Sequence, residues 1–200
     1  MSKLMKTIQL LFILLICATM NAQETQNNEL PYYKIPEYPE KYTAGSVAAR
    51  MVDGLGFRYY WATEGLRSED LAYKPSKEGR KCEETIDHIF GLSNVIVNAT
   101  TETVNDRTIQ YPELTYEEKR KRTLENFKKA SDILRVSKDL SKFKMIFKSK
   151  DGSSEFPFWN EINGPIADAI WHTGQVVLMR RASGNPFNSK VSVLAGKLRD

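Results

Sequence analysis

Apolar residues recur every three or four positions in four long segments of the chain, and this pattern constrains the fold more than any other feature. Such spacing places the apolar side chains on one face of an α-helix, and that face has to be buried against other elements. The segments cover about 43–66, 82–100, 115–138 and a last stretch that ends near Ser183. The pattern predicts an all-α fold in which four helices form one bundle.

The predicted helix ends carry local signals of their own. Thr43 is a suitable N-cap, and Thr115 with Glu118 three residues later has the pattern of a capping box. The start of the last helix is ambiguous because two prolines precede it. It begins either near Phe158 or only at Pro165, which would then be the first-turn proline.

A small β-hairpin is expected just ahead of the last helix. Asp151 and Gly152 separate two runs that contain β-forming residues, 143–147 and 153–158. Asp-Gly is a preferred two-residue hairpin turn. The other connections are polar, and the tail 187–200 holds only a short apolar piece.

Residues 1–22 have the pattern of a secretory signal peptide. Lys3 and Lys6 precede an apolar run over 8–17, and cleavage is expected before Gln23. The sequence therefore predicts a secreted or periplasmic protein, with a lipoprotein anchored at Cys17 as a weaker alternative. We expect a flexible lead-in over 23–41 and a single domain over 42–200. Ten apolar residues are too few to span a bilayer, so no integral membrane span is predicted.

The charge balance limits the kinds of partner that the chain can bind, and the cysteine content limits its disulfides. Loss of Lys3 and Lys6 with the signal peptide leaves 27 of the 29 Lys and Arg residues against 25 Asp and Glu. This near balance argues against a nucleic-acid partner. Cys82 is the only cysteine after residue 22, so no internal disulfide can form. Its thiol, near a helix start, is either reactive or inert.

The two histidines of the chain carry the main functional signal. His88 and His172 both lie on apolar helix faces, and Asp168 precedes His172 by four residues. Residues four apart stack on one helix face, so this pair points toward the helical core. Two imidazoles and one carboxylate make a three-ligand metal site with positions left open for water or substrate. This ligand set suits zinc and also non-haem iron.

Several alternatives and additions remain open at this point. Asp168 and His172 can instead form a hydrogen-bonded pair that balances their burial without any metal. Glu161, seven residues before Asp168, is a candidate fourth ligand if the helix reaches that far. Gln175 or Trp171 can orient an imidazole through its second nitrogen.

Three local patterns together resemble the DinB-like (YfiT-like) superfamily of four-helix-bundle metal proteins. The connection from Leu66 to Pro75 is similar to the segment that follows helix one in that family. His88 stands at the position of the helix-two metal histidine, and His172, with Gly-Gln after it, is similar to the last-helix signature. The resemblance covers about 43–186 and implies an up-down-down-up bundle. Asp168 departs from the family pattern, which usually has histidine there.

The resemblance implies a metal-dependent hydrolase or a thiol-dependent S-transferase acting on a small molecule. A divalent metal would bind at His88, Asp168 and His172, with zinc favoured over nickel, iron or manganese, and would activate a water or a thiol. One alternative is a non-catalytic exported bundle, related to stress, that binds metal or a small molecule. Another is a purely structural or dimerising bundle, for which a homodimer is the expected partner state.

Overall fold

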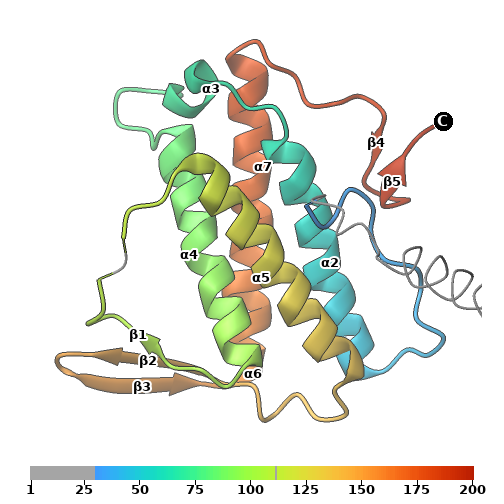
Figure 1. Cartoon of the computed structure of the whole chain (residues 1–200), viewed down its shortest axis with the longest axis vertical. Coiled ribbons are helices and arrows are strands. Elements are labelled where there is room, and N and C mark those ends of the chain that lie inside the picture. Colours follow the sequence, from blue (N-terminus) through green and yellow to red (C-terminus); the bar gives the residue numbers. More distant parts are fainter. Residues whose placement is uncertain (1–29, 111) are drawn as a thin grey trace, which may run out of the picture.

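Four long helices dominate the computed structural model, which describes residues 30–110 and 112–200. The helices lie side by side, and α2 and α4 each contact both α5 and α7 (Figure 1). Their bounds are α2 Ala44–Thr63, α4 Cys82–Thr100, α5 Tyr116–Val136 and α7 Ala167–Ala182. The prediction of a mostly helical chain is confirmed, and these bounds lie close to the expected ones.

Local capping explains why two of these helices begin where they do. In α2, the Thr43 hydroxyl accepts from the Ser46 amide at 3.1 Å, and the Ser46 hydroxyl accepts from the Thr43 amide at 2.9 Å. In α5, the Thr115 amide donates to the Glu118 carboxylate at 2.9 Å, and the Glu118 amide donates back to the Thr115 hydroxyl. Both caps satisfy amides that a helix start otherwise leaves without partners.

The last helix combines the two predicted starts. A short helix α6 (Phe158–Glu161) is followed by the π-helical turn η1 (Ile162–Ile166), and α7 continues from it. Pro165 lies inside η1, where Gly164 departs from helical backbone angles. Because proline has no amide N–H and crowds the preceding turn, the helix widens there into a π-helical turn instead of ending. The helix therefore begins at Phe158, with an irregular turn around Pro165.

The hairpin forms as expected, but it belongs to a larger sheet. Strands β2 (Met145–Ser149) and β3 (Gly152–Phe156) pair antiparallel, and β1 (Asn105–Asp106) adds to β2 in parallel. This sheet lies at one end of the long helices, and the short helix α3 (Ser68–Ala72) lies at the other (Figure 1). In the tail, β4 (Val191–Ser192) pairs with β5 (Lys197–Leu198).

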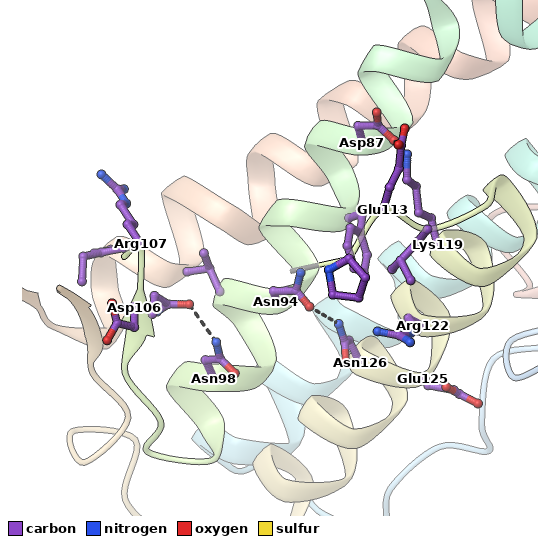
Figure 2. A pocket seen from close by; sticks show the side chains of 16 residues that line it. Asp87, Asn94, Asn98, Asp106, Arg107, Glu113, Lys119, Arg122, Glu125 and Asn126 are labelled. Carbon is purple, nitrogen blue, oxygen red and sulfur yellow. Dashed lines mark hydrogen bonds and ion pairs between the residues drawn. The ribbon is translucent and has the colours of Figure 1, made fainter. Parts of the chain in front are cut away.

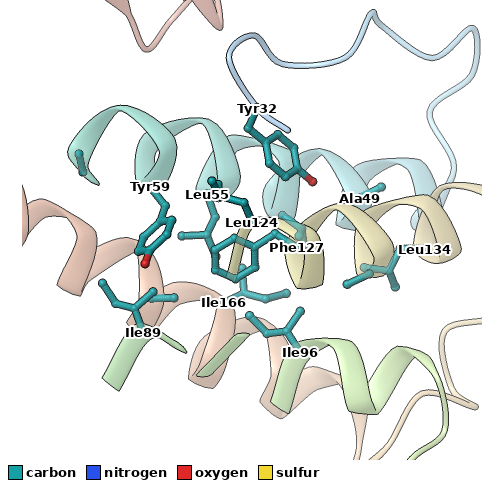
Figure 3. Close-up of a cluster of buried hydrophobic side chains, with 14 of the residues drawn as sticks. Tyr32, Ala49, Leu55, Tyr59, Ile89, Ile96, Leu124, Phe127, Leu134 and Ile166 are labelled. Atoms are coloured by element: carbon teal, nitrogen blue, oxygen red, sulfur yellow. The ribbon is translucent and has the colours of Figure 1, made fainter. Parts of the chain in front are cut away.

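A single apolar cluster fills the space between the long helices. Figure 3 shows Tyr59, Phe127 and Ile166 meeting there from three different helical segments. Burial of apolar surface of this kind is the main favourable term in folding. Since more than twenty buried side chains converge on one cluster, the core holds the helices at fixed distances and thereby positions the residues on their flanks.

The described part of the lead-in, 30–41, contains neither helix nor strand, yet it is anchored to the helices. Tyr32 is buried in the core and donates its hydroxyl to Asp53 at 3.1 Å. Asp53 also accepts from Ser131 at 2.5 Å and from Arg135 at 2.6 Å. This segment is therefore tied to α2 and α5 and does not act as a loose tether.

Within 30–110 and 112–200, no helix has both the length and the apolar character needed to cross a bilayer. The predicted signal peptide, 1–22, and the first part of the lead-in lie outside the described residues. Export is therefore still a prediction from the sequence.

Candidate metal centre

The three residues singled out in the sequence lie together between two adjacent helices. His88 comes from α4, and Asp168 and His172 come from α7. The His88 Nε2 atom lies 3.1 Å from Asp168 Oδ2, and His172 Nε2 lies 3.3 Å from Asp168 Oδ1. Each residue offers one ligand atom, and these atoms all lie within 4.8 Å of one another. The predicted convergence of two distant segments is therefore present in the structure.

Gln175 orients one of the two imidazoles. Its side-chain oxygen lies 2.8 Å from His172 Nδ1, which therefore carries the proton and donates it. In a neutral imidazole, Nε2 then holds the lone pair, and it faces the Asp168 carboxylate. At 3.3 Å these two atoms can share either a proton, as in the hydrogen-bonded alternative, or a metal ion. Of the two predicted orienting residues, Gln175 has this role.

The spacing of the group fits a metal ion. Two ligand atoms bound to one tetrahedral zinc at about 2.1 Å lie about 3.4 Å apart. The two imidazoles approach different oxygens of Asp168, His88 at 3.1 Å from Oδ2 and His172 at 3.3 Å from Oδ1. The imidazole rings lie edge to face, with centroids 4.6 Å apart. With one ligand atom from each residue, the three atoms lie within 4.8 Å of one another, so the group can hold a metal ion after a small adjustment of these side chains.

The group is more open than the sequence indicated. The side chains of His88 and Asp168 are 38% and 36% exposed, and that of His172 is 16% exposed. The buried face of α7 is formed instead by Ala169, Thr173 and the residues that follow them at helical spacing. Since one helical residue turns the chain by 100°, Asp168 and His172 flank this buried face and do not point into the core. Water and small molecules can therefore reach the group.

Glu161 is not part of the group, which corrects its prediction as a fourth ligand. The seven-residue spacing to Asp168 assumed a regular helix, and the π-helical turn η1 changes the rotation between the two residues. The Glu161 side chain is fully buried, and neither carboxylate oxygen has a hydrogen-bond partner among the described residues. Burial raises the pKa of this carboxyl to about 8, so it is mainly neutral at pH 7.

Cys82 is buried at the start of α4 and forms no disulfide. Burial raises the pKa of its thiol to about 11. Because the thiolate is the reactive form, this favours the inert alternative over a reactive thiol.

Arg180 is a structural residue that the sequence did not single out. Its guanidinium is buried and donates to the backbone carbonyls of Trp61, Ala62 and Glu64 near the end of α2. The neighbouring Arg181 is exposed. The 3.6-residue period cannot tell which of two adjacent arginines turns inward.

Close by, Asp70 fixes α3 to the end of α7. It accepts from the Ser183 hydroxyl at 2.5 Å and from the Asn185 amide at 2.6 Å. Hydrogen bonds from the Arg67 guanidinium hold the pKa of the Asp70 carboxyl well below its usual range. These residues belong to, or lie beside, segments that carry the family resemblance, and here they have structural roles.

Fold and site together define a mostly helical protein with a partly exposed His/Asp/His group that can hold a metal ion. Comparison with protein-family models, curated proteins and solved structures found no significant match to this chain. The resemblance to the DinB-like superfamily thus stays a prediction based on local sequence patterns.

Proposed function

We propose that this chain is an exported, DinB-like four-helix-bundle protein that binds a divalent metal ion through His88, Asp168 and His172. The observation that supports this most directly is the meeting of three ligand atoms within 4.8 Å from two helices. Zinc is the first choice among the metals, since two imidazoles and a carboxylate suit it. Nickel, iron and manganese are the alternatives.

We further propose that the bound ion serves a metal-dependent hydrolase or a thiol-dependent transferase. When bound at an open three-ligand site, such an ion lowers the pKa of a water or thiol toward neutrality. The chain supplies the remaining parts. Gln175 holds the proton of His172 on Nδ1 and so keeps Nε2 free as a ligand. Asp168 offsets part of the positive charge, and the exposure of His88 admits a substrate.

A non-catalytic binding protein is the second candidate, and one observation favours it. Catalysis of proton transfer needs an acid or base within hydrogen-bond reach of the reacting group. Glu161, the additional carboxyl expected on the same helix, is buried and is not in the group. The chain then retains metal binding but has no identified general base.

Calorimetric titration of chelator-treated protein with zinc chloride tests the binding. We expect one equivalent to bind, and we expect Asp168→Asn to weaken binding at least about tenfold, because the variant loses the charged ligand. Asp151→Asn is the matched control, since this substitution makes the same chemical change at a residue in the exposed hairpin turn. Equal zinc affinity in both variants would remove the proposed site.

Two activity assays separate the enzyme from the binding protein. Ester hydrolysis is measured with p-nitrophenyl acetate, and S-transfer with glutathione and an aryl halide. The enzyme proposal predicts turnover that chelator abolishes and zinc restores, in the wild type and in Asp151→Asn but not in Asp168→Asn. Tight zinc binding without turnover in either assay supports the non-catalytic candidate.

A further inference from the structure

A second site lies on a different face of α4 from the metal centre. A cavity of about 770 Å³ opens between α4, α5 and two segments of the connection between them, 105–107, which contains β1, and 112–114. Asp87 lines it, whereas the next residue, His88, faces Asp168 on α7. The volume lies within the range of small-ligand sites, about 300–1,000 Å³. Figure 2 shows its side chains, with Arg107 near one end and Arg122 near the other.

Carboxamide side chains line the middle of this cavity. Asn126 Nδ2 donates to Asn94 Oδ1 at 2.9 Å and to Ser93 Oγ at 3.0 Å. One helical turn further along α4, Asn98 Nδ2 donates to Asn105 Oδ1 at 2.9 Å. Dashed lines in Figure 2 mark the bond between Asn94 and Asn126 and the bond from Asn98. These bonds restrict the orientations of the amides. A preorganised amide loses little freedom when it binds a ligand.

Each amide pair keeps at least one donor and one acceptor for a ligand. In the first pair, the Asn94 amino group and the Asn126 oxygen have no partner within the described part of the chain. In the second pair, the Asn98 oxygen and one of its two N–H groups are free in the same sense. One donor beside one acceptor is what a peptide group needs, because it offers one C=O and one N–H.

The spacing of the two pairs matches an extended peptide. Asn94 and Asn98 are four residues apart on a helix, which corresponds to a rise of about 6 Å. Two residues of an extended chain span about 6.6 Å. Peptide groups that face the same side of a ligand therefore recur at nearly the interval of the amide pairs. Phe90, Leu114 and Phe147 also line the cavity and offer apolar surface to ligand side chains.

The charged side chains of the cavity indicate where the carboxylate end of such a ligand binds. Lys119 is already paired with Asp87 at 2.6 Å, and Glu125 with Lys121 at 3.8 Å. Arg122 and Arg107 both line the cavity without an ion-pair partner in the regions 30–110 and 112–200. The Arg107 guanidinium stacks on the Phe147 ring, 4.8 Å from its centroid, so we assign the carboxylate of the ligand to Arg122. A guanidinium of this kind binds a carboxylate through two parallel hydrogen bonds.

We propose that this cavity binds a short peptide in an extended conformation. Its peptide groups bond to the amide pairs at Asn94 and Asn98, and its C-terminal carboxylate binds Arg122. The site uses a different face of α4 from the metal centre and does not depend on a bound metal.

Nuclear magnetic resonance titration of the full chain, with chelator present, tests the proposal. The probe is the tripeptide Ala-Ala-Ala, compared with the same peptide carrying a C-terminal amide. We expect the free acid to shift the side-chain amide signals of Asn94, Asn98 and Asn126. The amidated peptide should bind about tenfold more weakly, because it cannot make the charge-assisted bond to Arg122.

Two variants and a control complete the test. Arg122→Gln should remove the difference between acid and amide, and Asn94→Leu should weaken both peptides about tenfold or more. Lys129→Gln lies on the same helix α5 outside the cavity and should bind like wild type. Folding of each variant is verified from its backbone spectrum.

The proposal fails if Ala-Ala-Ala shifts none of the three asparagine signals up to about 10 mM, where a weak site of this size would be detected. It also fails if acetate alone reproduces the shifts at equal concentration. That result would reduce the cavity to a site for small anions at Arg122.

Discussion

Replacement of Glu161 by glutamine should make the protein more stable at alkaline pH. The wild-type carboxyl is fully buried without a hydrogen-bond partner among the described residues. Its pKa is raised from an ordinary 4.5 to about 8 because burial penalises the charged form. An unfolded chain restores the ordinary value, so the unfolded state loses its proton at lower pH than the folded state.

The sign and size of the effect follow from this difference. The neutral carboxyl contributes its full stability below pH 4.5, and that contribution is lost progressively as the pH rises to about 8. At about 1.36 kcal/mol per pH unit, the loss reaches about 5 kcal/mol once the carboxyl is charged in both states. Between pH 5 and pH 8 the wild type should lose about 3 kcal/mol through this group.

Urea unfolding at pH 5 and pH 8, with chelator present, measures the effect. Glu161→Gln removes the titration and keeps the shape of the side chain, so its advantage over wild type should grow by about 3 kcal/mol between the two pH values. Glu37→Gln, at a side chain that is 90% exposed, is the matched control and should show no such growth. Equal pH dependence of wild type and Glu161→Gln would refute the reasoning.

Three further outcomes follow from packing and charge. Gly45→Ala should lower the free energy of unfolding in urea by about 1–3 kcal/mol, because its Cβ would collide with backbone carbonyls at the end of α5. Gly91→Ala, where the added Cβ would meet open space, should raise it by about 0.5–1 kcal/mol. Arg135→Met should cost about 3 kcal/mol by the same assay, because it leaves Asp53 charged and buried, and a neutral result would contradict the ion pair. In a chain that starts at Gln23, Cys82 should react with a disulfide reagent at pH 8 about 100-fold more slowly than free cysteine, and fast labelling would contradict its burial.

Local patterns predicted the helices well because capping and periodicity act over a few residues. The capping box of Thr115 and Glu118 marked the start of α5 within one residue. The four-residue spacing of Asp168 and His172 placed both on one helix face. The meeting with His88 was different, since no local pattern joins α4 to α7. That expectation rested on both histidines lying on apolar helix faces and on the resemblance to a known family.

Long-range packing decided the features that the sequence did not predict. The pairing of Asn105 with Phe147 joins segments more than forty residues apart, and no turn signal connects them. Tyr32 is buried because Gly56 leaves room for its ring against α2. The π-helical turn around Pro165 removed Glu161 from the metal centre, since a proline in a helix can either begin it or distort it. Each outcome depends on what packs against the residue.

Elemental analysis of purified protein, wild type beside His88→Ala, tests the central claim most directly. Both proteins are exposed to the same metal mixture, freed of unbound ions, and verified by circular dichroism to be folded. The account predicts about one zinc per chain in the wild type and almost none in His88→Ala, because loss of one of three ligands leaves too few for stable binding. Equal metal content in the two proteins, or none in the wild type, would contradict the claim that His88, Asp168 and His172 hold one ion.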